Sequence, residues 1–511
     1  MVSLAVATWS LLASPRLCLP DETSPGRTEW PENPAARQRL LDAEASVTRA
    51  AARVGTDRYH PAYHFLPAGR FMNDPNGCVQ FQGDYHVFYQ HLPFWGEKDA
   101  SGAPGWGHAV SRDLVHWQHW PIALMPVPGT YDAQAVASGS CVIAEGLPTI
   151  VYTSVPPQAQ SLARSFDGMR TWRRFDRNPV VPKPPAIPGL EDGFRDPFVW
   201  RDGSQWRMLV GSGIRGKGGT VLLYESADLL SWRFVEPLCT GMGPDCFQWE
   251  CPNFFRLGDH WVLIVSPLLH SIPSLRGPVQ YAVGRFDGRH FEHGPWRPLD
   301  LGGPAVFYAP NSLDDDRGRR ILWGWLMGGG APEAPWNGML TLPRQLTLGD
   351  DLRLRVWPVE EVDTLRKESI ADLGSRDLAP GDLLEVCRGT QLDVVVELSR
   401  QTPGRLVVEL FRSAAGDHAT TVSFDVASGE LRCGDRSGIV PPGARNLCTL
   451  RFLVDRSVIE VYADHREVMS QRVFPPSGAD ALRLTAQKSP VRLERVRAWR
   501  VDTIWPTRRG Q

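Results

Sequence analysis

The sequence predicts an all-β protein: a five-bladed β-propeller followed by a C-terminal β-sandwich, with a short N-terminal helix. Three observations lead to this fold class. The 511 residues include 48 glycines and 44 prolines, which is typical of a chain with many turns. Strand-turn-strand units recur five times at intervals near 60 residues. Beyond about residue 383 these units give way to longer strands of alternating polarity.

The N-terminal extension, residues 1–58, contains the one segment with a clear helical pattern. Asn33 is a favourable N-cap, Pro34 takes the first helical position, and apolar residues recur toward Gly55. The stretch Leu4–Ala13 is apolar, but no Lys or Arg precedes it and it is too short to span a bilayer. No other run approaches the length of a transmembrane helix, so we expect no membrane partner.

The propeller is predicted over residues 59–360. Two markers recur in it with the same period, which favours a propeller over an irregular sandwich with chance turn spacing. One marker is the turn glycine of each unit, at Gly83, Gly146, Gly203, Gly258 and Gly318. The other lies between the units and carries Asp113, Asp167, Asp228 and Asp287. The repeat stops around Leu342–Trp357, and the regular strands that follow predict an antiparallel sandwich over residues 361–511.

Composition narrows the function. Lys and Arg number 55 against 57 Asp and Glu, a net charge of −2, so the chain has neither a basic footprint for nucleic acid nor an acidic tail. The 19 tryptophans provide flat apolar surface of the kind that stacks on sugars. We therefore expect a small-molecule sugar as partner and no nucleic acid, while the oligomeric state stays open.

Three acids occupy nearly the same place in three repeats. Asp74, Asp196 and Glu250 lie nine, seven and eight positions before their turn glycines, and the other two repeats carry Ser138 and Pro310 there. In a propeller these positions fall on the innermost strands and converge on the axis. Each local motif alone could be a turn or an ordinary ion pair, but their common register predicts a carboxylate cluster at one mouth of the channel.

Clustered carboxylates repel one another and usually persist for catalysis or for cation binding. Hydrolysis of a glycosidic bond needs two of them, one protonated to assist the leaving oxygen and one ionised to attack or stabilise the reacting carbon. Glu250 and Asp74 can divide these roles. The alternatives are a catalytically silent carbohydrate-binding propeller and a cation-binding structural propeller.

Other motifs give no support for a cofactor or a metal. Gly211, Gly213 and Gly216 spell GxGxxG, but no helix follows, so we interpret them as a loop. For His108 and His116 a structural hydrogen bond is the favoured interpretation. Nine scattered cysteines do not form a disulfide framework, and no pair has the spacing of a zinc site.

From Tyr63 to the C-terminus the chain resembles glycoside hydrolase family 32, the invertase and fructanase family. The segments that carry the resemblance are HFLPAGRFMNDPNG, FYQ, WGHAVSRDLVHW, SGS, FRDPFVW, WECPNFF, FYAPNSLDDDRGRRILWGW, WNGMLTLPRQLTL and LRFLVDRSVIEVY. The family fold, a five-bladed propeller followed by a β-sandwich, agrees with the prediction above. The resemblance implies a retaining β-fructofuranosidase that hydrolyses terminal β-fructosyl units of sucrose, sucrose 6-phosphate or a related fructoside.

The resemblance also implies residue roles. Asp74 is the expected nucleophile, Glu250 the general acid and base, and Asp196 with Arg195 the group that holds the fructosyl hydroxyls. The expected pocket residues are Phe71, Met72, Asn73, Gln90, Trp95, Ala137, Ser138 and Arg195.

Three departures from the family pattern affect the expected pocket. Ala137 replaces a usual aromatic, Asn253 replaces a common Asp, and His91-Leu92 replaces a frequent Asn-Pro. These leave the leaving-group preference open, and a fructan exo-hydrolase or a fructosyltransferase stays an alternative. Lys98 and Arg215 are loop candidates for phosphate recognition. The N-terminal helix resembles that of intracellular bacterial relatives, so a cytoplasmic location is expected over export.

Overall fold

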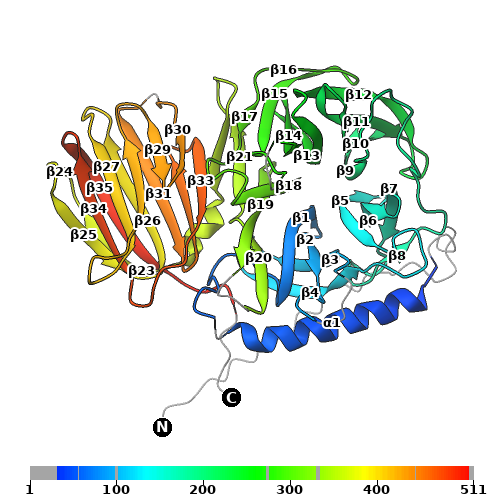
Figure 1. Cartoon of the computed structure of the whole chain (residues 1–511), viewed down its shortest axis with the longest axis horizontal. Coiled ribbons are helices and arrows are strands. Elements are labelled where there is room, and N and C mark those ends of the chain that lie inside the picture. Colours follow the sequence, from blue (N-terminus) through cyan, green and yellow to red (C-terminus); the bar gives the residue numbers. More distant parts are fainter. Residues whose placement is uncertain are drawn as a thin grey trace, which may run out of the picture.

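The computed structural model of the chain describes residues 31–55, 57–97, 102–271, 275–329, 334–443 and 445–505. It confirms the predicted fold class: five blades of β-strands stand around a common centre, and a two-sheet sandwich lies beside them (Figure 1). The apolar stretch Leu4–Ala13 and Lys98 lie outside the described residues.

The predicted helix is α1 (Pro34–Val54), and Asn33 caps it as expected, since its Oδ1 accepts a hydrogen bond from the Ala36 amide at 3.1 Å. The helix runs along the outside of the first blade (Figure 1). Its buried face packs against Phe94, Ile122 and Met125. No helix in the described part of the chain is long and apolar enough to cross a membrane.

The first three blades each have four antiparallel strands. Blade I consists of β1 (Arg70–Phe81), β2 (Asp84–Leu92), β3 (Gly105–Ser111) and β4 (Trp117–Leu124). Blade II consists of β5 (Ala135–Ala144), β6 (Leu147–Val155), β7 (Ala159–Arg164) and β8 (Arg173–Arg174). Blade III consists of β9 (Arg195–Asp202), β10 (Gln205–Ile214), β11 (Gly218–Ser226) and β12 (Arg233–Met242).

The last two blades are less regular. Blade IV consists of β13 (Cys246–Leu257), β14 (His260–Leu269), β15 (Gln280–Phe286), β16 (Phe291–His293) and β17 (Arg297–Pro298). Blade V consists of β18 (Phe307–Asp314), β19 (Arg320–Gly329), β21 (Arg344–Leu348) and β22 (Leu354–Pro358). Between β19 and β21 in the sequence lies β20 (Trp336–Leu340), which pairs with β19 and also, in parallel, with β1. This strand joins the last blade to the first and closes the ring.

The two sequence markers have local structural causes. The five turn glycines all have φ between 58° and 87°, a region that glycine adopts without the steric cost of a side chain. The four aspartates each accept hydrogen bonds from backbone amides two to four residues later, so each closes a tight turn. The sequence repeat therefore reflects the residue requirements of the turns that connect the strands.

The segment Leu342–Trp357, where the repeat stops, lies within the predicted propeller range and forms the outer hairpin of blade V. One sequence interpretation is corrected. Gly211 and Gly213 lie in strand β10 and not in a loop. A Cβ on Gly213 would lie 1.7 Å from the Phe247 carbonyl oxygen, and one on Gly211 2.3 Å from that of Trp249. The glycines let blade IV approach blade III closely.

The sandwich has two antiparallel sheets. One contains β23 (Arg366–Leu373), β24 (Arg376–Leu378), β35 (Val491–Val501), β26 (Gln391–Ser399), β31 (Leu447–Asp455), β32 (Val458–Ala463) and β33 (Glu467–Arg472). The other contains β25 (Leu383–Arg388), β34 (Ala481–Gln487), β27 (Arg405–Arg412), β28 (Thr420–Asp425), β29 (Glu430–Cys433) and β30 (Arg436–Ile439). A 3₁₀ helix, η2 (Glu360–Leu365), connects the domains, and we propose residues 360 and 361 as the boundary.

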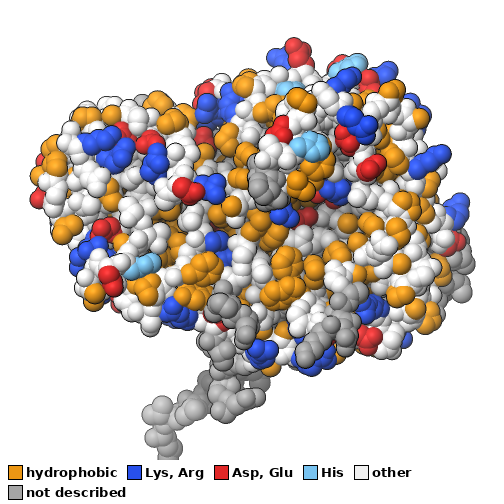
Figure 2. Space-filling model, in the orientation of Figure 1, with side chains coloured by type: hydrophobic (Ala, Val, Ile, Leu, Met, Phe, Trp, Pro, Cys, Tyr) orange, Lys and Arg blue, Asp and Glu red, His pale blue; other side chains and the backbone are white. Residues whose placement is uncertain are grey.

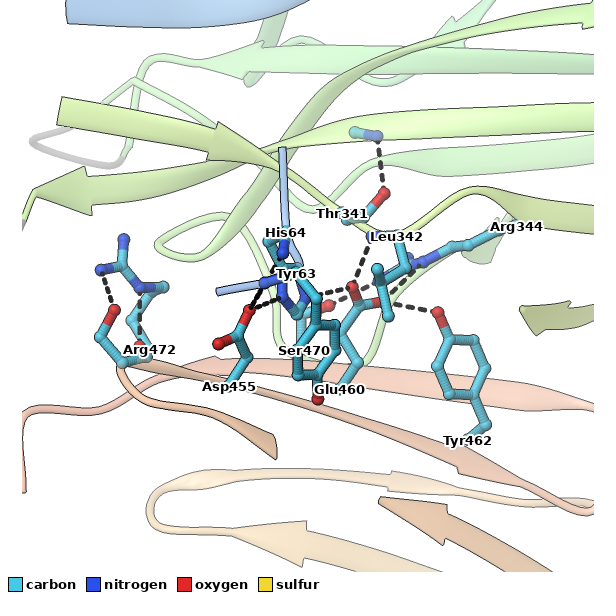
Figure 3. A network of polar contacts seen from close by, with 12 residues as sticks. Tyr63, His64, Thr341, Leu342, Arg344, Asp455, Glu460, Tyr462, Ser470 and Arg472 are labelled. Atoms are coloured by element: carbon cyan, nitrogen blue, oxygen red, sulfur yellow. Dashed lines mark hydrogen bonds and ion pairs between the residues drawn. The ribbon is translucent and has the colours of Figure 1, made fainter. Parts of the chain in front are cut away.

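A buried network of charges fastens the sandwich to the propeller (Figure 3). Arg344 of blade V pairs with Glu460 of β32 at 2.6 Å and with Asp300 at 2.8 Å, and none of the three side chains is exposed. His64 lies between Asp455 at 2.9 Å and Glu460 at 3.0 Å. Burial alone would raise the pKa of Glu460, but Arg344 and His64 hold it at about 2. The position of the sandwich thus depends on charges that are satisfied only in the assembled fold.

Candidate active site

The innermost strands of all five blades are irregular at the same level. Strands β1, β5, β9, β13 and β18 contact one another in a closed ring around the centre of the propeller (Figure 1). Each of them loses its register with the next strand of its blade near its N-terminal end. Such β-bulges re-aim side chains and are frequent beside active sites. They also explain why the three acids lie at unequal distances from their turn glycines.

The bulges hold several side chains in strained backbone conformations. Asp196, Cys251 and Ala309 have φ of 66°, 45° and 46°, in the left-handed region that non-glycine residues seldom adopt. All three lie in the bulges of β9, β13 and β18. The strain is therefore concentrated at the level of the acids.

Asp74 is held by donors from two blades. Its Oδ2 accepts a hydrogen bond from the Ser138 hydroxyl of blade II at 2.7 Å, and its Oδ1 accepts one from the side-chain amide of the neighbouring Asn73 at 2.9 Å. Burial raises the pKa of Asp74, whereas the Ser138 hydrogen bond opposes that rise and the negative charge of Glu250 adds to it. The two donors thus favour the charged form of a carboxylate whose charge burial disfavours.

Asp196 is buried and connects to both other acids. Its Oδ2 accepts a hydrogen bond from the Cys251 amide at 3.0 Å. The Cys251 thiol lies 3.6 Å from this oxygen and 3.6 Å from Oδ2 of Asp74, so one sulfur bridges two carboxylates. Burial raises the pKa of Asp196 to about 7. The positive charge of Arg195 opposes this rise, and the negative charges of Glu250 and Asp74 add to it.

Glu250 is partly accessible, with 19% of its side chain exposed. Arg195 donates to its Oε1 from Nε at 2.9 Å and from Nη2 at 2.6 Å. The Tyr308 hydroxyl lies 2.9 Å from Oε2, and the carbonyl oxygens of Ser266 and Pro267 lie 3.2 and 3.1 Å from the same hydroxyl. Both carboxylate oxygens of Glu250 are thus occupied by donors.

The structure brings the three predicted acids together. Asp74 and Asp196 both contact the Cys251 thiol. The negative charge of Glu250 raises the pKa of both, and Arg195, which binds Glu250, lowers the pKa of Asp196. Three carboxylates in three different environments can supply a nucleophile, a proton donor and a binding group to one bond.

The other expected pocket residues lie close by in blades I and II. Phe71 and Trp95 are half-buried, with ring centroids 6.0 Å apart, and Met72 is fully buried. Gln90 donates to the Val136 carbonyl at 2.9 Å, and the half-exposed Ala137 accepts from the Trp106 indole at 3.0 Å through its carbonyl. Gln90 and Met72 are therefore buried supports of the strands that carry the other expected residues.

The departures from the family pattern also have defined contacts. Asn253 donates to the carbonyl oxygens of Pro310 at 2.8 Å and Cys251 at 3.2 Å, which an ionised aspartate could not do. His91 lies 2.9 Å from the Phe71 carbonyl, and burial lowers its pKa to about 4. Both side chains thus bind backbone carbonyl groups of the strands that carry the acids or adjoin them.

Sequence reasoning missed Tyr308, Cys251 and Arg276. Tyr308 lies in blade V ten residues before its turn glycine, near the place where the search found acids in other blades. A search of that position for any polar side chain would have found it. Arg276 has no repeat marker, and its position depends on the path of the loop after β14.

His108 and His116 make the structural hydrogen bonds that the sequence favours. His108 contacts His86 at 3.0 Å, and His116 contacts Asp113 at 2.8 Å. The eight described cysteines are free thiols. In the described ranges no group of three His, Cys, Asp or Glu side chains could hold a metal ion.

The opposite end of the propeller axis has a cavity of its own, of about 650 Å³. It is lined by the C-terminal halves of the innermost strands, including Arg201, Asp202 and Arg320. None of the three acids lines it. On the face shown in Figure 2, positive and negative side chains are interspersed without a large patch of either sign.

Comparisons with known proteins agree over nearly the whole chain. The family model for the N-terminal domain of glycosyl hydrolases family 32 matches residues 64–358, and the model for the C-terminal domain of that family matches residues 361–500. Raffinose invertase of Escherichia coli is 32% identical over 483 residues, covering 88% of this chain and 96% of the relative.

Two further matches are of the same kind. A sucrose-6-phosphate hydrolase of Escherichia coli is 31% identical over 492 residues, covering 91% of this chain and 99% of the relative. The solved structure of a β-fructofuranosidase from Bombyx mori superposes with a TM-score of 0.78 at 28% identity, covering 92% of this chain and 100% of that one.

Proposed function

The chain belongs to glycoside hydrolase family 32 and is a β-fructofuranosidase, and we propose that Asp74 is its nucleophile and Glu250 its general acid and base. The observation that carries this assignment is the meeting of three acids from three blades at one level of the axis, joined by the Cys251 thiol and by Arg195.

In the first step the Asp74 carboxylate attacks the anomeric carbon of the terminal fructosyl unit. The bond to the leaving oxygen breaks, and Glu250 gives that oxygen a proton. Ser138 and Asn73 hold Asp74 ionised and aimed for the attack. In the second step Glu250 takes a proton from water, the water oxygen attacks the fructosyl carbon, and Asp74 leaves. Two inversions give net retention.

Glu250 must release one contact to carry a proton. Tyr308 can do this at little cost, because its hydroxyl has the carbonyl oxygens of Ser266 and Pro267 within reach as other acceptors. Oε2 of Glu250 is then available for the leaving oxygen, while Arg195 keeps Oε1 in place. In this proposal Asp196 and Arg195 hold the fructosyl hydroxyls.

The roles are tested with Asp74→Asn and Glu250→Gln, measured on sucrose. Loss of general acid catalysis at Glu250 should lower kcat about 10²- to 10⁴-fold, and much less on a fructoside whose leaving group needs no proton. Asp74→Asn should abolish turnover on both. Asp202→Asn, the same change at the far end of β9, is the matched control. Sucrose turnover by Glu250→Gln at the normal rate would contradict the assignment.

Retention is tested separately by following the configuration of the first released fructose by NMR. A retaining enzyme places its two carboxyl groups about 5–5.5 Å apart, closer than an inverting one. Release of the opposite anomer would refute the nucleophilic role of Asp74.

Product analysis on sucrose, inulin and levan separates an invertase from the fructan exo-hydrolase and fructosyltransferase alternatives. We propose sucrose or its phosphate ester as the preferred substrate. A cytoplasmic location, inferred from the resemblance, is part of the proposal and is tested by cell fractionation.

A further inference from the structure

Arg276 lies at the rim of the site on the side of Glu250. Its backbone bridges to Leu268 at the end of β14, next to the carbonyl of Pro267 that the Tyr308 hydroxyl approaches. Its guanidinium carbon lies 5.3 Å from the ring centroid of Tyr308. Tyr308 in turn contacts Glu250, so one aromatic ring separates the cation from the acid.

The same guanidinium also lies at one end of a row of aromatic rings formed by Trp325, Phe71 and Trp95. It lies 5.4 Å from the Trp325 ring, the Trp325 and Phe71 centroids are 6.2 Å apart, and Phe71 continues to Trp95. The general acid protonates the leaving oxygen, so the leaving sugar must lie on its side of the pocket. Arg276 is therefore placed at the outer end of that sugar.

Arg276 also differs from the two other arginines of this mouth in its partners. Arg195 pairs with Glu250, and Arg70 pairs with Glu97. Arg276 has no ion pair and no side-chain hydrogen bond with any described residue, and its Nε is buried without an acceptor. A guanidinium with unpaired donors that is partly removed from water lacks both a counter-charge and acceptors.

We propose that Arg276 is a specificity-determining residue that binds a phosphate monoester on the leaving sugar, as in the glucosyl 6-phosphate ester of sucrose. The inference rests on the proposed function, since it takes Glu250 to define the leaving-group side. A phosphate supplies the missing charge and the paired oxygens that match a guanidinium fork. A neutral hydroxyl would leave the charge uncompensated.

The two sequence candidates for this role are weaker. Arg215 is 76% exposed on its side chain and lies 3.5 Å from Glu191, so it already has a counter-charge. Lys98 lies outside the described residues.

The test compares kcat/KM for sucrose and for sucrose 6-phosphate in the wild type, Arg276→Gln and Arg276→Lys. Arg201→Gln is the matched control, because Arg201 also covers an aromatic ring, that of Trp206 at 4.9 Å, but lines the opposite cavity. Binding of glucose 6-phosphate, glucose and inorganic phosphate is measured by calorimetry on the same proteins. Melting temperatures establish that each variant is folded.

The wild type should prefer the phosphorylated substrate. Arg276→Gln should lose about 10- to 100-fold in kcat/KM on it and less than about threefold on sucrose, since one charge-assisted contact is removed. Arg276→Lys should keep part of the preference, and Arg201→Gln all of it. Glucose 6-phosphate should bind more tightly than glucose or inorganic phosphate, and only in proteins that keep a cation at 276.

Equal loss on both substrates in Arg276→Gln, or no preference in the wild type, would overturn the inference. Binding of inorganic phosphate as tight as that of glucose 6-phosphate would also overturn it, since the sugar would then contribute nothing. If neither fructoside is hydrolysed but glucose 6-phosphate binding still depends on Arg276, the proposed function fails and the anion site stands.

Discussion

Replacing Ser138 with alanine removes one hydrogen bond from the proposed nucleophile and leaves the others. The Ser138 hydroxyl donates to Oδ2 of Asp74 at 2.7 Å, whereas Asn73 continues to donate to Oδ1. A hydrogen bond to a charged group contributes about 1.5–3 kcal/mol. Because it favours the ionised carboxylate, its loss must raise the pKa of Asp74 further above the ordinary value.

The expected result is a shift of the acidic limb of the pH profile to higher pH. On that limb kcat/KM for sucrose should fall about 10- to 100-fold, since each 1.4 kcal/mol is a factor of ten in the ionised fraction. Toward alkaline pH, where Asp74 is ionised in both proteins, the difference should narrow. The profile of kcat/KM is the right measurement because it reports groups of the free enzyme.

Ser140→Ala is the control on the same strand. Ser140 donates to the Pro197 carbonyl at 2.9 Å and accepts from the Val199 amide at 3.1 Å, and neither bond involves a carboxylate. It should lower stability and leave the pH profile in place. An acidic limb of Ser138→Ala that stays at the wild-type pH, or moves lower, would refute the role given to this hydrogen bond.

Two further predictions concern support of the site and of the fold. Ser46→Ala should raise KM for sucrose severalfold with kcat little changed, because the Ser46 hydroxyl of α1 binds the loop that carries Trp95. Thr48→Ala, at an exposed position of the same helix, is the control. A fall in kcat without a rise in KM would contradict this prediction. Glu460→Gln should lower the free energy of unfolding by about 3–5 kcal/mol in thermal or urea melts at neutral pH, whereas exposed Glu360→Gln should not. Because the folded pKa of Glu460, about 2, lies below its unfolded value, its contribution is present above about pH 4.5 and is lost as pH falls toward 2, so the two melts should converge there.

Much of the fold could be predicted from sequence because its signals are local. A turn that needs positive φ calls for glycine, as at Gly83 and Gly258, and an Asp that closes a tight turn bonds to its own neighbours. These requirements repeat with each blade, so the blade count and the approximate level of Asp74 and Glu250 could be read from spacing alone.

The contacts of the site could not be predicted in the same way. The sequence places Arg195 beside Asp196, but in the structure its donors reach Glu250, 55 residues away. The glycines at 211 and 213 suggest a loop in the sequence, but Gly213 is required by the close approach of another blade and not by a turn.

The sequence by itself determined the repeated blades, the sandwich after them and the residues able to carry the chemistry, since turn geometry and strand alternation depend on neighbours in the chain. Only the tertiary structure decided that bulges turn the acids to one level, that a thiol bridges Asp74 and Asp196, and that Arg276 lies over Tyr308 without an ion pair to any described residue. The physical reason is that charge and hydrogen-bond partners are chosen by packing between blades, where sequence distance has no bearing on which groups meet.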